Sequence, residues 1–167
     1  MRNRCIGAAA AAAMAACAQA PARASRATPD VNRLAATDLH GAPVAIGGPG
    51  PVRLVELWAT WCEPCERAAA AARPVLARHP RVTAYAIAVD SDRASIAQHA
   101  ARAVGEILVV QGGAAAASRA GFYRVPTFVA LDHRGRVVGE VTGAAPQLAA
   151  ALERLLRHAE AEVGERD

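Results

Sequence analysis

The chain has 167 residues, a formal net charge of +4 and 53% hydrophobic residues, which suffices for the core of one ordinary domain. All 19 basic residues are arginine, and they are scattered along the chain and not interleaved with aromatic residues on one face. This pattern argues against nucleic acid as a partner.

Residues 1–24 have the layout of an export signal. Arg2 and Arg4 supply a basic start, a short apolar stretch follows, and small residues come next, including Ala20 and Ala24. The apolar stretch is shorter than the roughly 20 residues that cross a membrane. Cleavage after Ala20 or Ala24 would release a soluble protein into an oxidising compartment, the bacterial periplasm.

A second interpretation of the leader stays open. The sequence Met14-Ala15-Ala16-Cys17 resembles the processing box of a bacterial lipoprotein, with Met where Leu is more usual. Cys17 would then carry the lipid as the first mature residue, and the Ala-, Pro-, Ser- and Arg-rich residues 18–30 would form a flexible tether. Of the two interpretations we favour the lipoprotein, in which the protein is anchored in the cell envelope.

Residues 31–160 are expected to form one domain in which strands alternate with helices. The predicted elements are a strand pair at 39–46 around Gly41, a buried strand at 52–58, a helix at 62–78, a strand at 82–90, a helix from an N-cap at Ser91 to 104, a strand at 106–111, a short helix at 114–121, two strands flanking a turn at 132–135, and a helix at 146–158. Pro74 should kink or break its helix, because proline has no N–H to donate. This order predicts an α/β sandwich with a mixed central β-sheet flanked by helices.

The residues Cys62-Glu63-Pro64-Cys65 form a CxxC motif where the buried strand turns into its helix. The spacing lets one sulfur reach the other, and the N–H groups and dipole of the helix N-terminus favour the thiolate of Cys62. A CxxC beside a strand and helix pattern indicates redox chemistry. The site also lies where open α/β sheets usually carry one, beyond the carboxyl ends of their strands.

Other uses of the two cysteines fit less well. A structural zinc site needs four ligands, but the mature domain has no second cysteine pair and its histidines are dispersed, so no metal is expected. A purely structural disulfide would gain little from so short a loop. The histidines are His40, His79, His99, His133 and His158.

Two stretches, LVELWATWCEPC and YRVPTFVALDHRGRVVGEVTG, resemble the signature blocks of the thioredoxin superfamily, and within it of the exported TlpA/ResA-like thiol-disulfide oxidoreductases. The resemblance covers most of residues 37–157. It implies a thioredoxin-like sandwich and disulfide exchange that needs no cofactor. We expect the protein to be a monomer.

The resemblance also implies roles for the residues of the motif. Cys62 would be the exposed nucleophile that forms a mixed disulfide, and Cys65 would resolve it. Trp61 would cover the site, and Pro64 would hold the turn. Further along, Pro126 aligns with the cis-proline that faces the disulfide in this family, and the backbone of Val125 would pair with an extended substrate strand.

Two glutamates place negative charge near the cysteines. Glu56 takes the position of the buried acid that thioredoxins carry behind the resolving cysteine, and the alternation of Leu54, Glu56 and Trp58 along the strand is compatible with burial. Burial would raise its pKa and suit it to take the proton of Cys65. The alternative is that Glu56 faces solvent or pairs with an arginine. Glu63 should raise the pKa of Cys62 and make the pair a weaker oxidant.

The predicted function is an exported thiol-disulfide oxidoreductase. By resemblance it would reduce disulfides of envelope proteins, such as apocytochrome c during cytochrome c maturation or a copper-site assembly factor, with electrons from a membrane donor of the reductase type. A thiol oxidase or isomerase, a peroxidase and a metallochaperone are the alternatives. Relatives often carry Glu and Pro where this chain has Ala68 and Ala70, which leaves the partner open.

Overall fold

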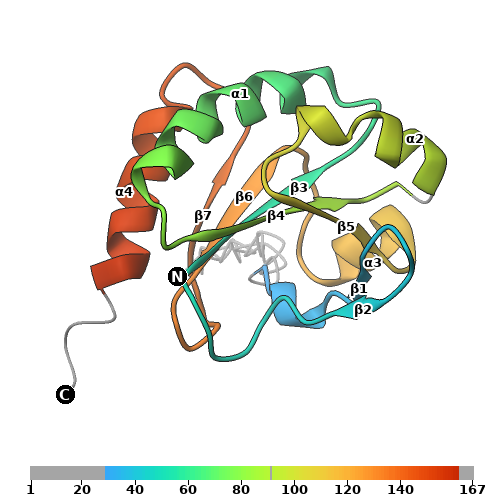
Figure 1. Cartoon of the computed structure of the whole chain (residues 1–167), viewed down its shortest axis with the longest axis horizontal. Coiled ribbons are helices and arrows are strands. Elements are labelled where there is room, and N and C mark those ends of the chain that lie inside the picture. Colours follow the sequence, from blue (N-terminus) through green and yellow to red (C-terminus); the bar gives the residue numbers. More distant parts are fainter. Residues whose placement is uncertain (1–28, 91, 162–167) are drawn as a thin grey trace, which may run out of the picture.

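The computed structural model describes residues 29–90 and 92–161, and the predicted export signal and Cys17 lie outside this range. The described residues build a seven-stranded sheet in the order β2-β1-β5-β4-β3-β6-β7 (Figure 1). The strands are β1 (Ala36–Thr37), β2 (Pro43–Val44), β3 (Arg53–Trp58), β4 (Thr83–Ala88), β5 (Glu106–Val110), β6 (Thr127–Leu131) and β7 (Val137–Thr142).

Strand β3 lies inside the sheet and leads to the CxxC motif. It pairs in parallel with β4 and antiparallel with β6, while β4 pairs in parallel with β5 and β7 closes an antiparallel hairpin on β6. All six residues of β3 are buried. A strand covered on both faces reads as a continuous apolar run, which is why a charged residue within it stands out in the sequence.

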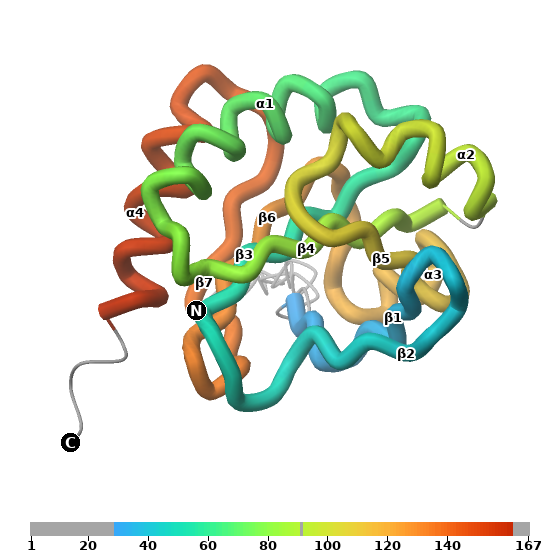
Figure 2. Tube along the Cα trace, viewed as in Figure 1, coloured from blue at the N-terminus to red at the C-terminus, as the bar shows by residue number. Residues whose placement is uncertain are grey.

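Helices cover both faces of the sheet, so the predicted mixed sheet flanked by helices is confirmed. Helices α1 (Glu63–Arg78) and α4 (Leu148–Ala161) lie side by side on one face, and α3 (Gly113–Arg119) lies on the other (Figures 1 and 2). Helix α4 turns Leu148, Leu152 and Leu156 inward at the spacing of one helical face. Two further elements, α2 (Arg93–Gln98) and the 3-10 helix η2 (Ala100–Arg102), follow β4, and a 3-10 helix η1 (Val31–Arg33) precedes β1.

The first strand of the predicted pair at 39–46 lies earlier in the chain than predicted. The pair does flank Gly41, but its first strand is β1, which ends at Thr37 and pairs with both β2 and β5. Asp38 ends the strand, because its carboxylate accepts hydrogen bonds from the N–H groups of His40 and Ala42 and so folds the chain into a turn.

The helix predicted from Ser91 to residue 104 is also wrong in its bounds. Asp92 caps α2 by accepting a hydrogen bond from the N–H of Ala94, and Ser91 lies outside the described residues. The helix stops at Gln98, where the imidazole of His99 bonds the carbonyl of Ser95, and the chain continues as η2. A helix end often tightens into such a 3-10 turn.

Pro74 does not break α1, which runs on to Arg78. The missing N–H of Pro74 deprives the carbonyl of Ala70 of its donor, but Ala70 is exposed and water can take the donor's place. The guanidinium of Arg78 donates to the carbonyl of Pro74 at 2.8 Å.

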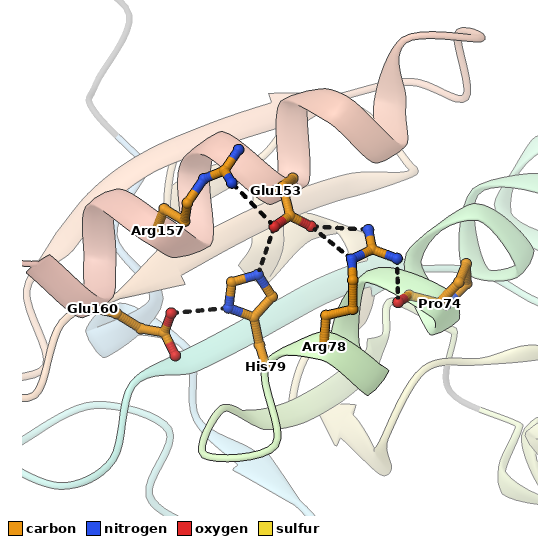
Figure 3. Close-up of polar contacts among 6 residues, drawn as sticks. All are labelled: Pro74, Arg78, His79, Glu153, Arg157 and Glu160. Carbon is orange, nitrogen blue, oxygen red and sulfur yellow. Dashed lines mark hydrogen bonds and ion pairs between the residues drawn. The ribbon is translucent and has the colours of Figure 1, made fainter.

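Polar contacts fasten the C-terminal end of α1 to α4 (Figure 3). His79, which caps α1, places its Nδ1 2.8 Å from a carboxylate oxygen of Glu160 and its Nε2 3.3 Å from one of Glu153. Glu153 also pairs with Arg78 at 2.9 Å and with Arg157 at 3.5 Å. The imidazole is only 7% exposed, so it is the buried centre of this cluster.

Replacing His79 by Ala is expected to destabilise the protein by about 1–3 kcal/mol, because two carboxylates lose their partner and a buried ring is removed. Urea denaturation of the two proteins measures the difference. His158→Ala, at an exposed position on the same helix α4, serves as control and should change stability by less than about 0.5 kcal/mol. Equal losses in both variants would show that the contacts of His79 contribute nothing.

Candidate active site

The CxxC motif lies at the carboxyl end of β3, in a turn that starts α1. The turn is fixed by hydrogen bonds from the N–H of Cys62 to the carbonyl of Ala59 and from the N–H of Thr60 to a carboxylate oxygen of Asp90. Cys62 is the N-cap of α1, and its sulfur is joined to that of Cys65 in a disulfide with a Cα–Cα separation of 5.3 Å. The structure is therefore that of the oxidised protein.

The two cysteines are almost equally buried, although the resemblance implied that Cys62 is exposed and Cys65 is shielded. Cys62 is 5% exposed and Cys65 is 3% exposed, so the expectation of a solvent-exposed Cys62 is wrong for the oxidised form. The N–H of Cys62 donates to the carbonyl of Ala59, and the disulfide joins Cys62 to Cys65 in the first turn of α1. What distinguishes Cys62 is its place at the helix N-terminus, where the first N–H groups and the dipole stabilise a thiolate.

The two residues between the cysteines differ in their surroundings. Pro64 occupies the first turn of α1, where no N–H is needed for the helix. The side chain of Glu63 is 84% exposed and forms an ion pair with Arg67 at 2.6 Å. Solvent and this arginine weaken the field of Glu63 at Cys62, so its predicted effect on the redox pair should be small.

Glu56 is buried in the middle of β3, with 1% of its surface exposed. One carboxyl oxygen, Oε2, accepts a long hydrogen bond of 3.4 Å from the N–H of Val104, and the other, Oε1, has no hydrogen-bond partner among the described residues. Burial raises the pKa of Glu56 to about 8, which keeps the carboxyl protonated at neutral pH. The alternative of a pair with Arg53 is wrong, because that guanidinium donates to the carbonyls of Gly48 and Pro49.

A small cavity behind the disulfide brings Glu56 and Cys65 together. The residues that line it include Glu56, Trp58 and both cysteines, Cys62 and Cys65, and it leaves room for about one water molecule. The lining also includes the polar residues Thr60, Glu66, His99 and Arg102. The buried carboxyl therefore lines the same small, partly open pocket as the two cysteines, an arrangement compatible with proton transfer between them.

The bond between Val125 and Pro126 is cis, as the resemblance implies. Val125 lies with Trp61 and Tyr123 around an apolar hollow between the CxxC turn and α3. Trp61 is 71% exposed and Tyr123 is 55% exposed, and they are the exposed large apolar side chains of the described residues. The indole of Trp61 is therefore largely open to solvent.

The sequence did not reveal two residues of this region, Tyr123 and His99. Tyr123 stands two residues before Val125, so its closeness to the cis-proline was a usable signal. In the sequence His99 is one of five dispersed histidines, and the residues next to it carry no motif that links it to the cysteines. Within residues 29–90 and 92–161, no three His, Cys, Asp or Glu side chains are grouped as ligands for a metal ion.

Comparison with known proteins establishes the fold. No protein-family model matches the chain, and no curated protein sequence does either. Solved structures do match. An uncharacterized thioredoxin-like protein of Porphyromonas gingivalis has a TM-score of 0.65 at 22% identity, over 80% of this chain and 93% of that one.

Two further structures are similar to this chain. A candidate thiol:disulfide interchange protein DsbE of Chlorobium tepidum has a TM-score of 0.63 at 21% identity, over 78% of this chain and 96% of its own. A secreted disulfide oxidoreductase of Mycobacterium tuberculosis, homologous to DsbE of Escherichia coli, has a TM-score of 0.59 at 22% identity. The match covers 77% of this chain and 96% of that one. The likeness confirms the predicted thioredoxin-like fold.

Proposed function

We propose that this chain, which has the thioredoxin fold, is an exported thiol-disulfide oxidoreductase that reduces disulfides in proteins of the bacterial cell envelope. One observation carries the proposal: the Cys62–Cys65 disulfide at the start of α1 lines the same small pocket as the protonated, buried Glu56. A disulfide with only a structural role would need no acid behind it. The names of the structural neighbours add support, since they describe disulfide interchange in proteins of the same fold.

The reaction begins with the reduced pair. The thiolate of Cys62 attacks one sulfur of a substrate disulfide, a bond forms between the two sulfurs, and the second substrate sulfur leaves as a thiolate that takes a proton from water. The product is a mixed disulfide between Cys62 and the substrate. The helix N-terminus at Cys62 stabilises the attacking thiolate.

Cys65 then resolves the mixed disulfide. Its thiol passes a proton to the carboxylate of Glu56, and the resulting thiolate attacks the sulfur of Cys62 and releases the substrate as a thiolate. Two electrons have moved from the pair to the substrate, and Glu56 has gained a proton. This product, with its disulfide and its protonated Glu56, corresponds to the form that the structure describes.

A membrane electron donor of the reductase type would close the cycle. Its thiolate attacks the sulfur of Cys62, and Cys65 leaves as a thiolate that takes the proton of Glu56. A second donor thiol then frees Cys62. The raised pKa of Glu56 serves this half of the cycle, because the acid is protonated when the leaving thiolate needs it.

Substrate binding is assigned to the surface around the cis-proline. Val125 lies two residues before the first residue of β6 and outside the pairings of that strand, so its backbone is placed to pair with an extended segment. The apolar hollow beside it, with Trp61 and Tyr123 at its rim, suits an apolar side chain of that segment. The resemblance implies apocytochrome c or a copper-site assembly factor as substrates.

Export is proposed from the leader and from a neighbour that is secreted. The helices among residues 29–90 and 92–161 include none with the length and hydropathy to cross a membrane. Mass spectrometry of the mature N-terminus decides between a lipid-bearing Cys17 and a free residue 21 or 25. Lipidation, if found, anchors the domain through residues 18–30.

The direction of electron flow is tested by a redox titration of the Cys62–Cys65 pair in dithiol and glutathione buffers. For a reductase we expect a potential nearer the about −270 mV of thioredoxin than the about −120 mV of the strong oxidant DsbA. A value at the oxidising end would contradict the reductase and support the thiol oxidase. The variant Glu63→Gln, measured in parallel, should differ little, since Glu63 is solvated and paired with Arg67.

A further inference from the structure

The burial of Glu56 keeps a proton on its carboxyl, which hinders the role of this residue as a proton acceptor. On the proposed function, the carboxylate must be free of its proton before it takes one from Cys65. At neutral pH the carboxyl holds a proton, because burial raises its pKa to about 8. A reduced protein that carries protons on both Glu56 and Cys65 has to release one of them to solvent before Cys65 can attack.

The cavity behind the disulfide offers a path for that proton. Glu56 is one of its lining residues, and the carboxyl oxygen Oε1 of this buried side chain has no hydrogen-bond partner among the described residues. The cavity leaves room for about one water molecule, which could take a proton from the carboxyl. Half-buried His99 lines the same cavity and is partly open to solvent.

The ring of His99 is oriented by a hydrogen bond. Its Nδ1 lies 2.8 Å from the carbonyl oxygen of Ser95. A carbonyl oxygen only accepts, so Nδ1 carries the hydrogen and the neutral ring keeps its lone pair on Nε2. Nε2 is therefore the nitrogen that is free to accept a proton.

The charged groups near the cavity, apart from Glu56 itself, lie on α1 and η2. Glu66 on α1 and Arg102 on η2 form an ion pair with one another, so neither is a free acceptor or donor. Arg73 on α1 lowers the pKa of Glu56 by its charge and donates to the carbonyls of Ala101 and Ala103. His99 is a lining side chain that can both accept and release a proton, through Nε2.

We infer that His99 exchanges protons between Glu56 and solvent, with water in the cavity as the carrier. The inference rests on the proposed function of Glu56 and adds a residue to it. In the outward direction the carboxyl gives its proton to water, the water gives one to Nε2 of His99, and the imidazolium releases one to solvent. No electrons move in this exchange. His99 thus acts on the reaction through Glu56, and it does not contact the sulfurs of a substrate.

The test uses the variant His99→Asn. The amide of Asn can still donate to the carbonyl of Ser95, but it has no group in place of Nε2. The matched control is His158→Asn, at an exposed position on α4 far along the chain from the cavity residues. The reduced proteins are mixed with oxidised glutathione, and the decay of the mixed disulfide on Cys62 is followed by rapid quenching and mass spectrometry across the pH range of Glu56.

We expect His99→Asn to slow this decay on the order of tenfold at pH below the pKa of Glu56 and to match the unaltered protein above it. Free imidazole should restore part of the lost rate. His158→Asn should leave the rate unchanged at every pH. An unchanged rate in His99→Asn would overturn the inference, and so would an equal loss at all pH values without rescue by imidazole.

Two additions keep the outcome unambiguous. If circular dichroism shows that His99→Asn is unfolded, His99→Gln takes its place, because its amide fills the outer position without titrating, and the same pH-dependent loss is expected. The glutathione reaction requires only the CxxC pair. Failure of the proposed function would appear separately, as inability of the unaltered protein to reduce protein disulfides, while the effect of His99 would still be read with glutathione.

Discussion

Replacement of Cys62 by Ser is expected to reduce the rate of protein-disulfide reduction to that of the dithiol reductant alone, whereas Cys65→Ser should trap a mixed disulfide. The first variant lacks the nucleophile at the helix N-terminus. The second retains the nucleophile but lacks the thiol that releases the substrate. Reduction of insulin by the protein with dithiothreitol, followed by turbidity, measures the loss.

The two variants are matched controls for one another. Each has lost the same disulfide and one sulfur atom, so any shared loss of stability cancels between them. Mass spectrometry of the reaction without excess dithiol should find a substrate adduct on Cys62 in Cys65→Ser and none in Cys62→Ser. An adduct on Cys65 in Cys62→Ser alone would reverse the assigned order of attack.

Replacement of Glu56 by Gln is expected to change both catalysis and the pH dependence of stability. The folded carboxyl has a pKa of about 8, against an ordinary value of 4.5 for glutamate. Below pH 4.5 both the folded and the unfolded carboxyl are protonated. Between 4.5 and 8 the unfolded chain releases the proton and the folded chain keeps it, so stability falls as pH rises.

The size of this loss follows from the shift. Each pKa unit corresponds to about 1.4 kcal/mol, so the unaltered protein should lose up to about 5 kcal/mol from this group between low pH and pH above 8. Glu56→Gln lacks the loss, and its advantage should grow with pH. Urea denaturation of both proteins at pH below 4.5, between 4.5 and 8, and above 8 checks the trend. A constant difference between them at all pH values would show that Glu56 is not buried as an acid.

The same substitution should slow the resolving step. A positioned acid or base contributes typically 10²- to 10⁴-fold, so we expect decay of the mixed disulfide in Glu56→Gln to slow on the order of 100-fold or more. Glu66→Gln is the control, since Glu66 lines the same cavity but is half exposed and paired with Arg102. It should change the rate only slightly. Equal rates for Glu56→Gln and the unaltered protein would leave Glu56 as a structural carboxyl.

The sequence predicted the parts of the site that follow from local pattern or from resemblance. The alternation along β3 indicated that Glu56 faces inward with Leu54 and Trp58, and its burial agrees. The helix after β3 placed Cys62 at an N-terminus, because Pro64 fits only the first turn. The resemblance predicted the cis bond before Pro126, although most bonds that precede a proline are trans.

The parts that were missed depend on segments distant in the sequence. Trp61 lines one hollow together with residues 122–125 and α3, and the sequence around the motif carries no information about that contact. His99 reaches the cavity because α2 stops at Gln98 and the chain tightens into η2. The prediction of one long helix to residue 104 placed His99 inside that helix and not at its end.

The central claim is that the Cys62–Cys65 pair passes two electrons to a protein disulfide. The most direct measurement mixes the fully reduced protein with a stoichiometric amount of oxidised insulin, without any other reductant, and counts thiols on both proteins after acid quenching. We predict that one insulin disulfide opens for each Cys62–Cys65 disulfide that forms, at a rate that Glu56→Gln lowers. Retention of both thiols on Cys62 and Cys65, with insulin still oxidised, would contradict the account.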